Sequence, residues 1–226
     1  MSIGENLAVI RSRIAGAAER SGRSPSDVKL VAVSKTHSSA TVREAIATGV
    51  NVFGENKIQE AEGKINEVGR DAAEWHLIGH LQSNKARRAV QLFDVIESVD
   101  SLELARRLER ICEEEGRESL PVFVEVDLGG EQTKSGIAES ELPELTDYFR
   151  SCKRLRFDGL MIVPPYFEDA EKTRPFFRRL REIRGSLGFE GDLSMGMSHD
   201  FEVAIEEGAT IVRVGTALFG EREYGR

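Results

Sequence analysis

Lys35 directly follows the apolar run LVAVS, a position where its amine could do chemistry. A lysine at the end of a buried strand is partly desolvated, and desolvation lowers its pKa and favours the neutral amine. The neutral amine is the nucleophile that forms a Schiff base with an aldehyde. A lysine in this position can also simply extend its ammonium group to solvent. The spacing alone leaves both interpretations open.

Two glycine-containing segments near the end of the sequence, SMGMSHD and IVRVGTALFGE, are candidates for an anion site. Backbone N–H groups at a glycine turn or a helix N-terminus bind anions, and we expect Ser198 to cap the helix after the first segment. Alternatively, Gly196, Gly215 and Gly220 only allow tight turns. The second segment is not a Walker nucleotide-binding loop, because no Lys-Ser or Lys-Thr pair follows its second glycine.

The elements that must position these residues alternate along the chain. Short β-branched runs bounded by turn residues alternate with stretches of helical period. The predicted strands cover residues 29–35, 51–56, 75–81, 94–100, 121–128, 157–164, 192–198 and 210–220. The predicted helices cover residues 6–20, 39–48, 58–68, 83–93, 102–115, 139–152, 169–183 and 200–208.

This order predicts one α/β domain over residues 1–226, a single (β/α)8 TIM-type barrel with an extra N-terminal helix. The alternative is an open doubly wound sheet. It is disfavoured because no GxGxxG motif follows the first strand.

Polar residues gather at the C-terminal ends of the predicted strands. In a barrel these ends open onto one face, where active sites form, and phosphate sites recur at the loops after the seventh and eighth strands. The residues at these ends are Lys35, Asn56, His80, Asp100, Asp127 and Arg213. Residues that are far apart in the sequence are therefore expected to be neighbours in space.

Several of these polar residues allow two interpretations. Arg213 shares the odd-even phase of Gly215 and should face the barrel mouth, where it needs a carboxylate or a ligand as acceptor. Asn56 donates to a ligand oxygen or caps a helix. His76 and His80 have an HxxxH spacing, but no clear third ligand lies nearby, so no metal site is predicted. One of the two histidines is expected to line the barrel mouth.

The bulk composition limits the partners of the chain. Its 226 residues carry a net charge of −8, which disfavours binding to nucleic-acid phosphates or anionic lipids. No apolar run is long enough to cross a bilayer, and the charged N-terminal segment does not have the pattern of a signal peptide. Cys112 and Cys152 have no metal-type spacing. We therefore expect a cytoplasmic protein without nucleic-acid or membrane partners.

Taken together, these segments resemble the pyridoxal phosphate homeostasis proteins, which are relatives of the N-terminal barrel of alanine racemase. The matching blocks run from AVSKT at 32–36 to VRVGTALFGER at 212–222. Between them stand FGENKIQEA, WHLIGHLQSNK, VDSLELARRL, KSGI, GLMIVPP and LSMGMSHD. The resemblance implies a barrel of pyridoxal 5'-phosphate (PLP) fold type III without the β-domain of the racemases. It also implies a protein that holds, buffers or transfers PLP with no strong catalytic turnover.

The resemblance further implies a role for individual residues. Lys35 would carry PLP as a Schiff base, and Arg213 would face the pyridine nitrogen. A guanidinium at that place disfavours protonation of the nitrogen, which makes the ring a poorer electron sink. The other implied contacts are Ser198, Gly215 and Thr216 with the phosphate, Ser194 and Met197 in the same loop, and Asn56 and His76 beside the ring.

One segment departs from the family pattern. The family usually has Val-Asn-x-Ser-Gly-Glu where this chain has VDLGGE, so Asp127 and Gly129 stand in place of Asn and Ser. We therefore base no mechanism on this segment. Lys85 and Lys134 lie near the same face, and each is either a second PLP contact or a solvated loop lysine, the latter being favoured.

Two other functions need similar residues. An amino-acid racemase needs a second acid/base, which racemases of this type take from a tyrosine of the β-domain. The chain ends soon after its eighth strand, and of Tyr148, Tyr166 and Tyr224 only Tyr166 is placed to approach the barrel mouth. A Schiff-base aldolase acting on a sugar phosphate would also need a lysine and a phosphate site. Without the racemase dimer interface we expect a monomer, with PLP and apo PLP-dependent enzymes as its partners.

Overall fold

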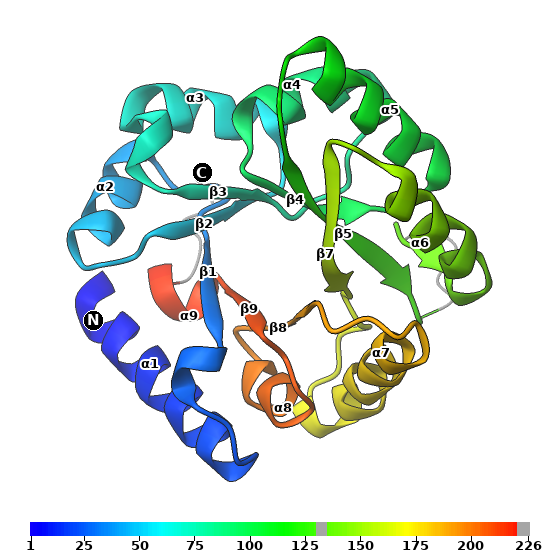
Figure 1. The fold of residues 1–226 in the computed structure, drawn as a ribbon. Helices are drawn as coiled ribbons and strands as arrows, with labels where there is room; N and C mark the ends of the chain where they lie inside the picture. The colour runs from blue at the N-terminus through cyan, green and yellow to red at the C-terminus, as the bar shows by residue number, and fades with distance from the viewer. Residues whose placement is uncertain (130–134, 221–226) are drawn as a thin grey trace.

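The computed structural model describes residues 1–129 and 135–220, and their strands form a closed barrel (Figure 1). The strands are hydrogen-bonded in the order β4-β3-β2-β1-β9-β8-β7-β5-β6, and an additional pairing of β4 with β5 closes the sheet. The strands are β1 (Lys29–Val33), β2 (Val52–Glu55), β3 (Glu74–Leu77), β4 (Val95–Val99), β5 (Leu120–Asp127), β6 (Ile137–Ala138), β7 (Leu155–Met161), β8 (Asp192–Met197) and β9 (Ile211–Val214). The pairings described are all parallel, so the predicted (β/α)8 barrel is confirmed.

Helices surround the barrel (Figure 1). They are α1 (Ile3–Arg20), α2 (Ser39–Ala47), α3 (Ile58–Val68), α4 (Ala86–Leu92), α5 (Leu102–Glu114), α6 (Leu142–Ser151), α7 (Arg174–Ser186), α8 (Phe201–Glu206) and α9 (Thr216–Phe219). In α5 the buried residues Leu104, Leu108 and Ile111 recur every three to four positions, which gives the helix one apolar side. Ser101 caps this helix by accepting a hydrogen bond from the N–H of Leu104. The extra N-terminal helix α1 packs against α8 and α9.

Two apolar clusters fill the molecule. The larger cluster includes the fully buried Phe53 and Trp75, whose ring centroids lie 5.5 Å apart. The smaller cluster takes one residue from each of six strands: Val31, Val52, Val95, Phe123, Met161 and Ile211. Arg213 follows Ile211 by two positions on β9, so its side chain faces the same way. An apolar cluster and buried polar side chains therefore share this face of the barrel wall.

Some element boundaries differ from the predicted ones. α6 and α7 begin after short 3-10 turns, at Glu139–Glu141 and Ala170–Thr173, so they start later than predicted. Each has a proline in its first turn, where the missing N–H is not needed. The last predicted strand is shorter, because β9 ends at Val214 and the chain then forms the one-turn helix α9. The two-residue strand β6 was not predicted.

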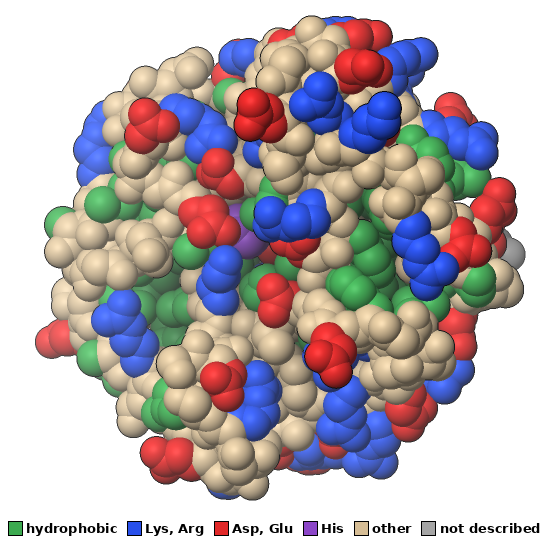
Figure 2. All heavy atoms as spheres, viewed as in Figure 1, with side chains coloured by type: hydrophobic (Ala, Val, Ile, Leu, Met, Phe, Trp, Pro, Cys, Tyr) green, Lys and Arg blue, Asp and Glu red, His purple; other side chains and the backbone are tan. Residues whose placement is uncertain are grey.

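The described ranges contain no helix that is long and apolar enough to span a bilayer. Within the same ranges, no cluster of three or more His, Cys, Asp and Glu side chains is arranged to hold a metal ion. Figure 2 shows acidic and basic side chains interspersed over one face of the molecule.

Candidate functional site

A cavity of about 310 Å³ lies at the C-terminal ends of the barrel strands, and we name it the Lys35 cavity. Seven of the nine predicted site residues line it: Lys35, Asn56, Met197, Ser198, Arg213, Gly215 and Thr216. Most of them lie at or just after the ends of β1, β2, β8 and β9, so the barrel brings together residues from both ends of the sequence. The other two, His76 and Ser194, are buried in the protein and do not line the cavity.

The lining of the Lys35 cavity favours an anionic ligand with an apolar body. Two cationic side chains, those of Lys35 and Arg213, belong to the lining, and none of the described lining residues is Asp or Glu. Val33, Ile78 and Val163 supply apolar wall. A concave, mostly apolar site with a few convergent polar groups is the usual form of a small-molecule site.

Ser198 connects the two glycine-containing turns at one end of the cavity. Its Oγ accepts hydrogen bonds from the backbone N–H groups of Gly215 at 3.2 Å and Ala217 at 3.3 Å. The prediction that Ser198 caps the next helix was wrong, because α8 begins at Phe201 after Asp200, without a side-chain cap. Because Oγ of Ser198 accepts both N–H groups, the hydroxyl proton of Ser198 remains available to an anion at this end of the cavity.

Gly196 makes this loop geometry possible. Its φ is 92°, a conformation that side-chain-bearing residues rarely adopt. A Cβ atom at this position would lie 2.5 Å from Cβ of Ala204 and 2.9 Å from Cα of Phe201. The approach of α8 to the end of β8 therefore needs glycine here.

Asn56 contributes a buried acceptor that lacks a partner. Its Oδ1 is buried and has no hydrogen-bond partner among the described residues. The side chain does not cap α3, since Lys57 is the N-cap residue and no side-chain cap bond is present. Buried polar atoms nearly always have a partner, so an orphaned acceptor in a cavity wall indicates a ligand or water donor.

The guanidinium of Arg213 is held by hydrogen bonds to backbone and side-chain oxygens. Its Nη1 donates to the carbonyl oxygen and to Oγ of Ser194, both at 2.7 Å, and its Nη2 donates to the carbonyl of Ile162 at 2.8 Å. The side chain is 3% exposed, and burial lowers its pKa. No direct ion pair of Arg213 is present in the described part of the chain, although the nearby carboxylates of Glu97, Glu125 and Asp200 favour its charge.

His76 belongs to a buried hydrogen-bond network that reaches Arg213 through Ser194. Its Nδ1 is 2.5 Å from Oε1 of Glu97 and its Nε2 is 2.7 Å from Oε1 of Glu74. Burial disfavours the imidazolium, but the hydrogen bonds to Glu74 and Glu97 outweigh it and raise the pKa of His76 to about 9. Burial also acts to raise the pKa of Glu97, yet His76 lowers it below the usual value. Ser194 donates its hydroxyl to Glu97, which joins His76 to Arg213 through two residues.

A neighbouring cavity of about 670 Å³ opens on the same side of the barrel and shares Asn56 with the Lys35 cavity. Its lining is acidic and includes Asp100, Glu125 and Asp127. His80 lines it and lies 3.0 Å from Asp100, so of His76 and His80 it is His80 that lies at the barrel mouth.

The two lysines considered for a second PLP contact are not part of either cavity's described lining. Lys85 donates to Gln59 at 3.3 Å on the protein surface. Lys134 lies outside the described residues.

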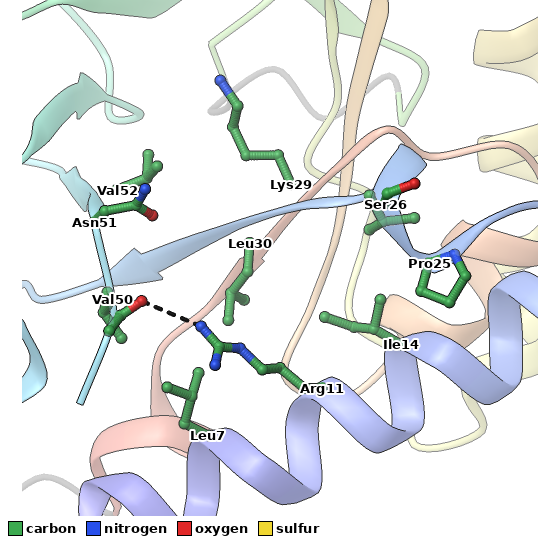
Figure 3. A pocket seen from close by; sticks show the side chains of 12 residues that line it. Leu7, Arg11, Ile14, Pro25, Ser26, Lys29, Leu30, Val50, Asn51 and Val52 are labelled. Carbon is green, nitrogen blue, oxygen red and sulfur yellow. Dashed lines mark hydrogen bonds between the residues drawn. The ribbon is translucent and has the colours of Figure 1, made fainter.

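A third cavity, of about 430 Å³, lies at the opposite end of the barrel between α1 and the starts of β1 and β2 (Figure 3). Arg11 crosses it and donates to the carbonyl of Gly49 at 3.1 Å, while Lys29 pairs with Glu74 at 3.2 Å. None of the predicted site residues lines this cavity. The N-terminal end of a TIM barrel usually serves stability, so we do not place the functional site here.

Some residues of the site were not foreseen from the sequence. His37, Val33 and His199 line the Lys35 cavity, and Tyr166, the one tyrosine expected near the mouth, lines it as well. His37 is only two positions after Lys35, which is the signal that would have indicated it. Val33 carries no such signal, because its type is that of any buried strand residue.

The fold and the site define the class of barrel found in the alanine racemase N-terminal domain, whose family model matches residues 6–223. A pyridoxal phosphate homeostasis protein of Pseudomonas aeruginosa is 46% identical over 225 residues, covering 99% of this chain and 97% of the relative. The corresponding protein of Aquifex aeolicus is 43% identical over 229 residues, covering 99% and 100%. PipY of Synechococcus elongatus, solved with PLP bound, has a TM-score of 0.83 and 39% identity, covering 97% of this chain and 100% of PipY. This chain belongs to the pyridoxal phosphate homeostasis protein family.

Proposed function

We propose that this protein binds PLP covalently through Lys35 and serves PLP homeostasis. The observation that carries the proposal is the Lys35 cavity, in which a lysine, a buried arginine and the Ser198 hydroxyl meet without a carboxylate among the described lining residues. Relatives over the full length are named for PLP homeostasis, and PipY has been solved with PLP bound. When bound, PLP supplies an aldehyde that Lys35 can attack to form a Schiff base.

The residues of the cavity fit the parts of PLP. Ser198, Gly215 and Thr216 would bind the phosphate, with Met197 beside them in the cavity lining. The orphaned Oδ1 of Asn56 would accept a hydrogen bond, for which the ring hydroxyl is a suitable donor.

Arg213 would face the pyridine nitrogen and keep it unprotonated, because two adjacent like charges are disfavoured. Ser194 and His76 would act through Arg213 rather than contact PLP, since both lie outside the cavity lining. The proposed role of His76 is therefore indirect.

The arrangement favours holding and transferring the cofactor over rapid catalysis. An unprotonated pyridine is a weak electron sink. Racemisation would need a second acid/base opposite the lysine. Tyr166 is the tyrosine among the described lining residues, and its ring centroid lies 5.7 Å from that of His199. It is 78% exposed, which is a poor setting for that role. The proposed setting is the cytoplasm, with a monomeric single-domain protein that transfers PLP to apo PLP-dependent enzymes.

The test is to locate the covalent adduct. PLP is added to the wild type, to Lys35→Ala and to Lys85→Ala, the complexes are reduced with borohydride, and peptide mass spectrometry identifies the modified residue. We expect the visible absorbance band and the adduct on Lys35 in the wild type and in Lys85→Ala, and neither in Lys35→Ala.

Two outcomes would contradict the proposal. An adduct only on another lysine would overturn the assignment of Lys35. If the wild type formed no adduct and no absorbance band, PLP itself would be excluded and a Schiff-base aldolase acting on a sugar phosphate would become the leading function.

A further inference from the structure

The turn that carries Lys35 has a backbone conformation that needs support. The N–H of His37 donates to the carbonyl of Ser34 at 3.1 Å, so residues 34–37 form a β-turn with Lys35 and Thr36 at its centre. Thr36 has a φ of 70° and is the one non-glycine residue with positive φ in the described parts of the chain. A β-branched residue rarely adopts this conformation, and it persists only where the surrounding structure holds it.

Lys64, on the inner side of α3, holds the first residue of this turn. Its Nζ donates to the carbonyl of Ser34 at 2.5 Å, and the whole residue is only 5% exposed. A buried lysine is uncommon, and it requires partners for its charge. Here the ammonium group donates to the carbonyl of Ser34, which also accepts the hydrogen bond that closes the turn.

Glu60, one helical turn before Lys64, holds the strained residue itself. Its Oε1 accepts a hydrogen bond from the N–H of Thr36 and lies 2.8 Å from Nζ of Lys64. Burial acts to raise the pKa of Glu60, but the hydrogen bonds from Lys64 and Thr36 outweigh it and lower the pKa. The carboxylate therefore stays ionised, which makes it a strong acceptor for the Thr36 N–H.

Glu55 at the end of β2 completes the cluster. Its Oε1 lies 2.7 Å from Nζ of Lys64 and accepts the hydroxyl proton of Ser34 at 2.6 Å. The side chains of Glu55 and Lys64 are 0% and 6% exposed. Three elements, β1, β2 and α3, thus meet at the residues before and after Lys35.

We propose that Glu60 and Lys64 are positioning residues for Lys35: they hold the strained turn at Thr36 and so direct the lysine into the cavity. The expected effect on PLP binding rests on the proposed function. The contacts of Glu60 and Lys64 with the turn, which we call the clamp, do not depend on it. A buried ion pair often adds little to the free energy of unfolding. We assign the Glu60–Lys64 pair the role of selecting one conformation of the turn. Neither residue belongs to the cavity lining, and their contacts with the turn are to the carbonyl of Ser34 and the N–H of Thr36.

The test compares Glu60→Ala with Glu62→Ala. Glu62 lies on the same helix and pairs with Arg88 on the surface, away from the turn. Amide hydrogen exchange at Thr36 and His37 is measured in the PLP-free proteins, and PLP affinity and the circular dichroism of the bound band are measured after loading. We expect Glu60→Ala to exchange faster at these two amides, to bind PLP roughly five- to tenfold more weakly, and to change the dichroism per bound PLP. Glu62→Ala should match the wild type in all three.

A rescue separates positioning from a general structural role. Asn tolerates positive φ, so Thr36→Asn removes much of the strain that the clamp must hold. The double variant Thr36→Asn/Glu60→Ala should recover most of the lost PLP affinity.

The possible failures are distinct. Equal exchange and equal affinity in Glu60→Ala and Glu62→Ala would overturn the inference, and so would a double variant that binds no better than Glu60→Ala. If the wild type did not bind PLP, the proposed function would fail, while the exchange comparison would still decide whether Glu60 holds the turn.

Discussion

Nδ1 of His76 lies 2.5 Å from Oε1 of Glu97 in the interior of the protein, where both side chains are almost fully buried. The other carboxylate oxygen of Glu97 accepts the hydroxyl proton of Ser194, and that hydroxyl accepts a hydrogen bond from Arg213. One ionised carboxylate thus stands between two cations. This arrangement ties the stability of the barrel to the protonation of His76 and supports the arginine proposed to face PLP.

We expect the stabilisation from His76 to disappear at alkaline pH. The pKa of His76 is raised to about 9 in the folded protein, while it is near 6.5 when unfolded. The contribution is therefore complete below about pH 6.5 and lost as the pH rises through about 9. Its size is on the order of 3 kcal/mol. Urea unfolding of the wild type and of His76→Gln should show a difference in unfolding free energy that shrinks from pH 6.5 to pH 9.5.

His199→Gln is the control for that series, because His199 is exposed on the surface. Its unfolding free energy should stay within about 0.5 kcal/mol of the wild type. A His76→Gln difference that is constant over the pH range would show that His76 is not charged in the folded protein.

Arg213→Gln should change the protonation of bound PLP. The substitution removes the cation proposed to lie beside the pyridine nitrogen, so the pKa of that nitrogen should rise. It also removes hydrogen bonds to Ser194 and Ile162, which should lower the unfolding free energy by about 1–3 kcal/mol. A pH titration of the absorbance of bound PLP measures the first effect. Identical titrations in the variant and the wild type would place the guanidinium elsewhere.

Ser198→Ala should weaken the binding of the phosphorylated cofactor selectively. The hydroxyl is one of the donors that converge at the end of the Lys35 cavity, so its loss should reduce PLP affinity roughly tenfold. Pyridoxal, which lacks the phosphate, should bind the variant and the wild type within about twofold of each other. Ser151→Ala, which alters an exposed serine on α6, is the matched control. A parallel loss for pyridoxal would show that Ser198 does not contact the phosphate.

Gly196→Ala should be strongly destabilising, because the new Cβ would collide with Ala204 and Phe201 and the residue has a φ of 92°. We expect a loss of more than about 3 kcal/mol in the unfolding free energy, measured with urea. Gly188→Ala isolates the backbone contribution, since Gly188 has a φ of 61° but no atom within 4 Å of the added Cβ. That control should lose only about 1 kcal/mol. Similar losses at both positions would mean that the close approach of α8 is not constrained.

Much of the fold was predictable because its signals are local. The alternation of β-branched runs with amphipathic stretches predicts the barrel, and Lys35 and Asn56 can be placed at strand ends from their neighbours alone. The helices α6 and α7 start later than predicted, because each is preceded by a short 3-10 turn of the kind that is frequent at helix N-termini. Ser198 is predicted to cap the next helix in sequence, whereas its hydroxyl accepts hydrogen bonds from Gly215 and Ala217 at the start of α9.

The barrel, the lysine at the end of its first strand and the family can each be predicted from the residues alone, since they depend on order and type along the chain. The packing of the folded chain determines which polar residues meet. It separated His76 and Ser194 from the cavity, although both belong to matching blocks of the sequence. It also brought Lys64 and Glu60 to the turn at Thr36, where residues from a helix and two strands meet. Such contacts depend on how neighbouring elements pack, and no local pattern in the chain encodes them.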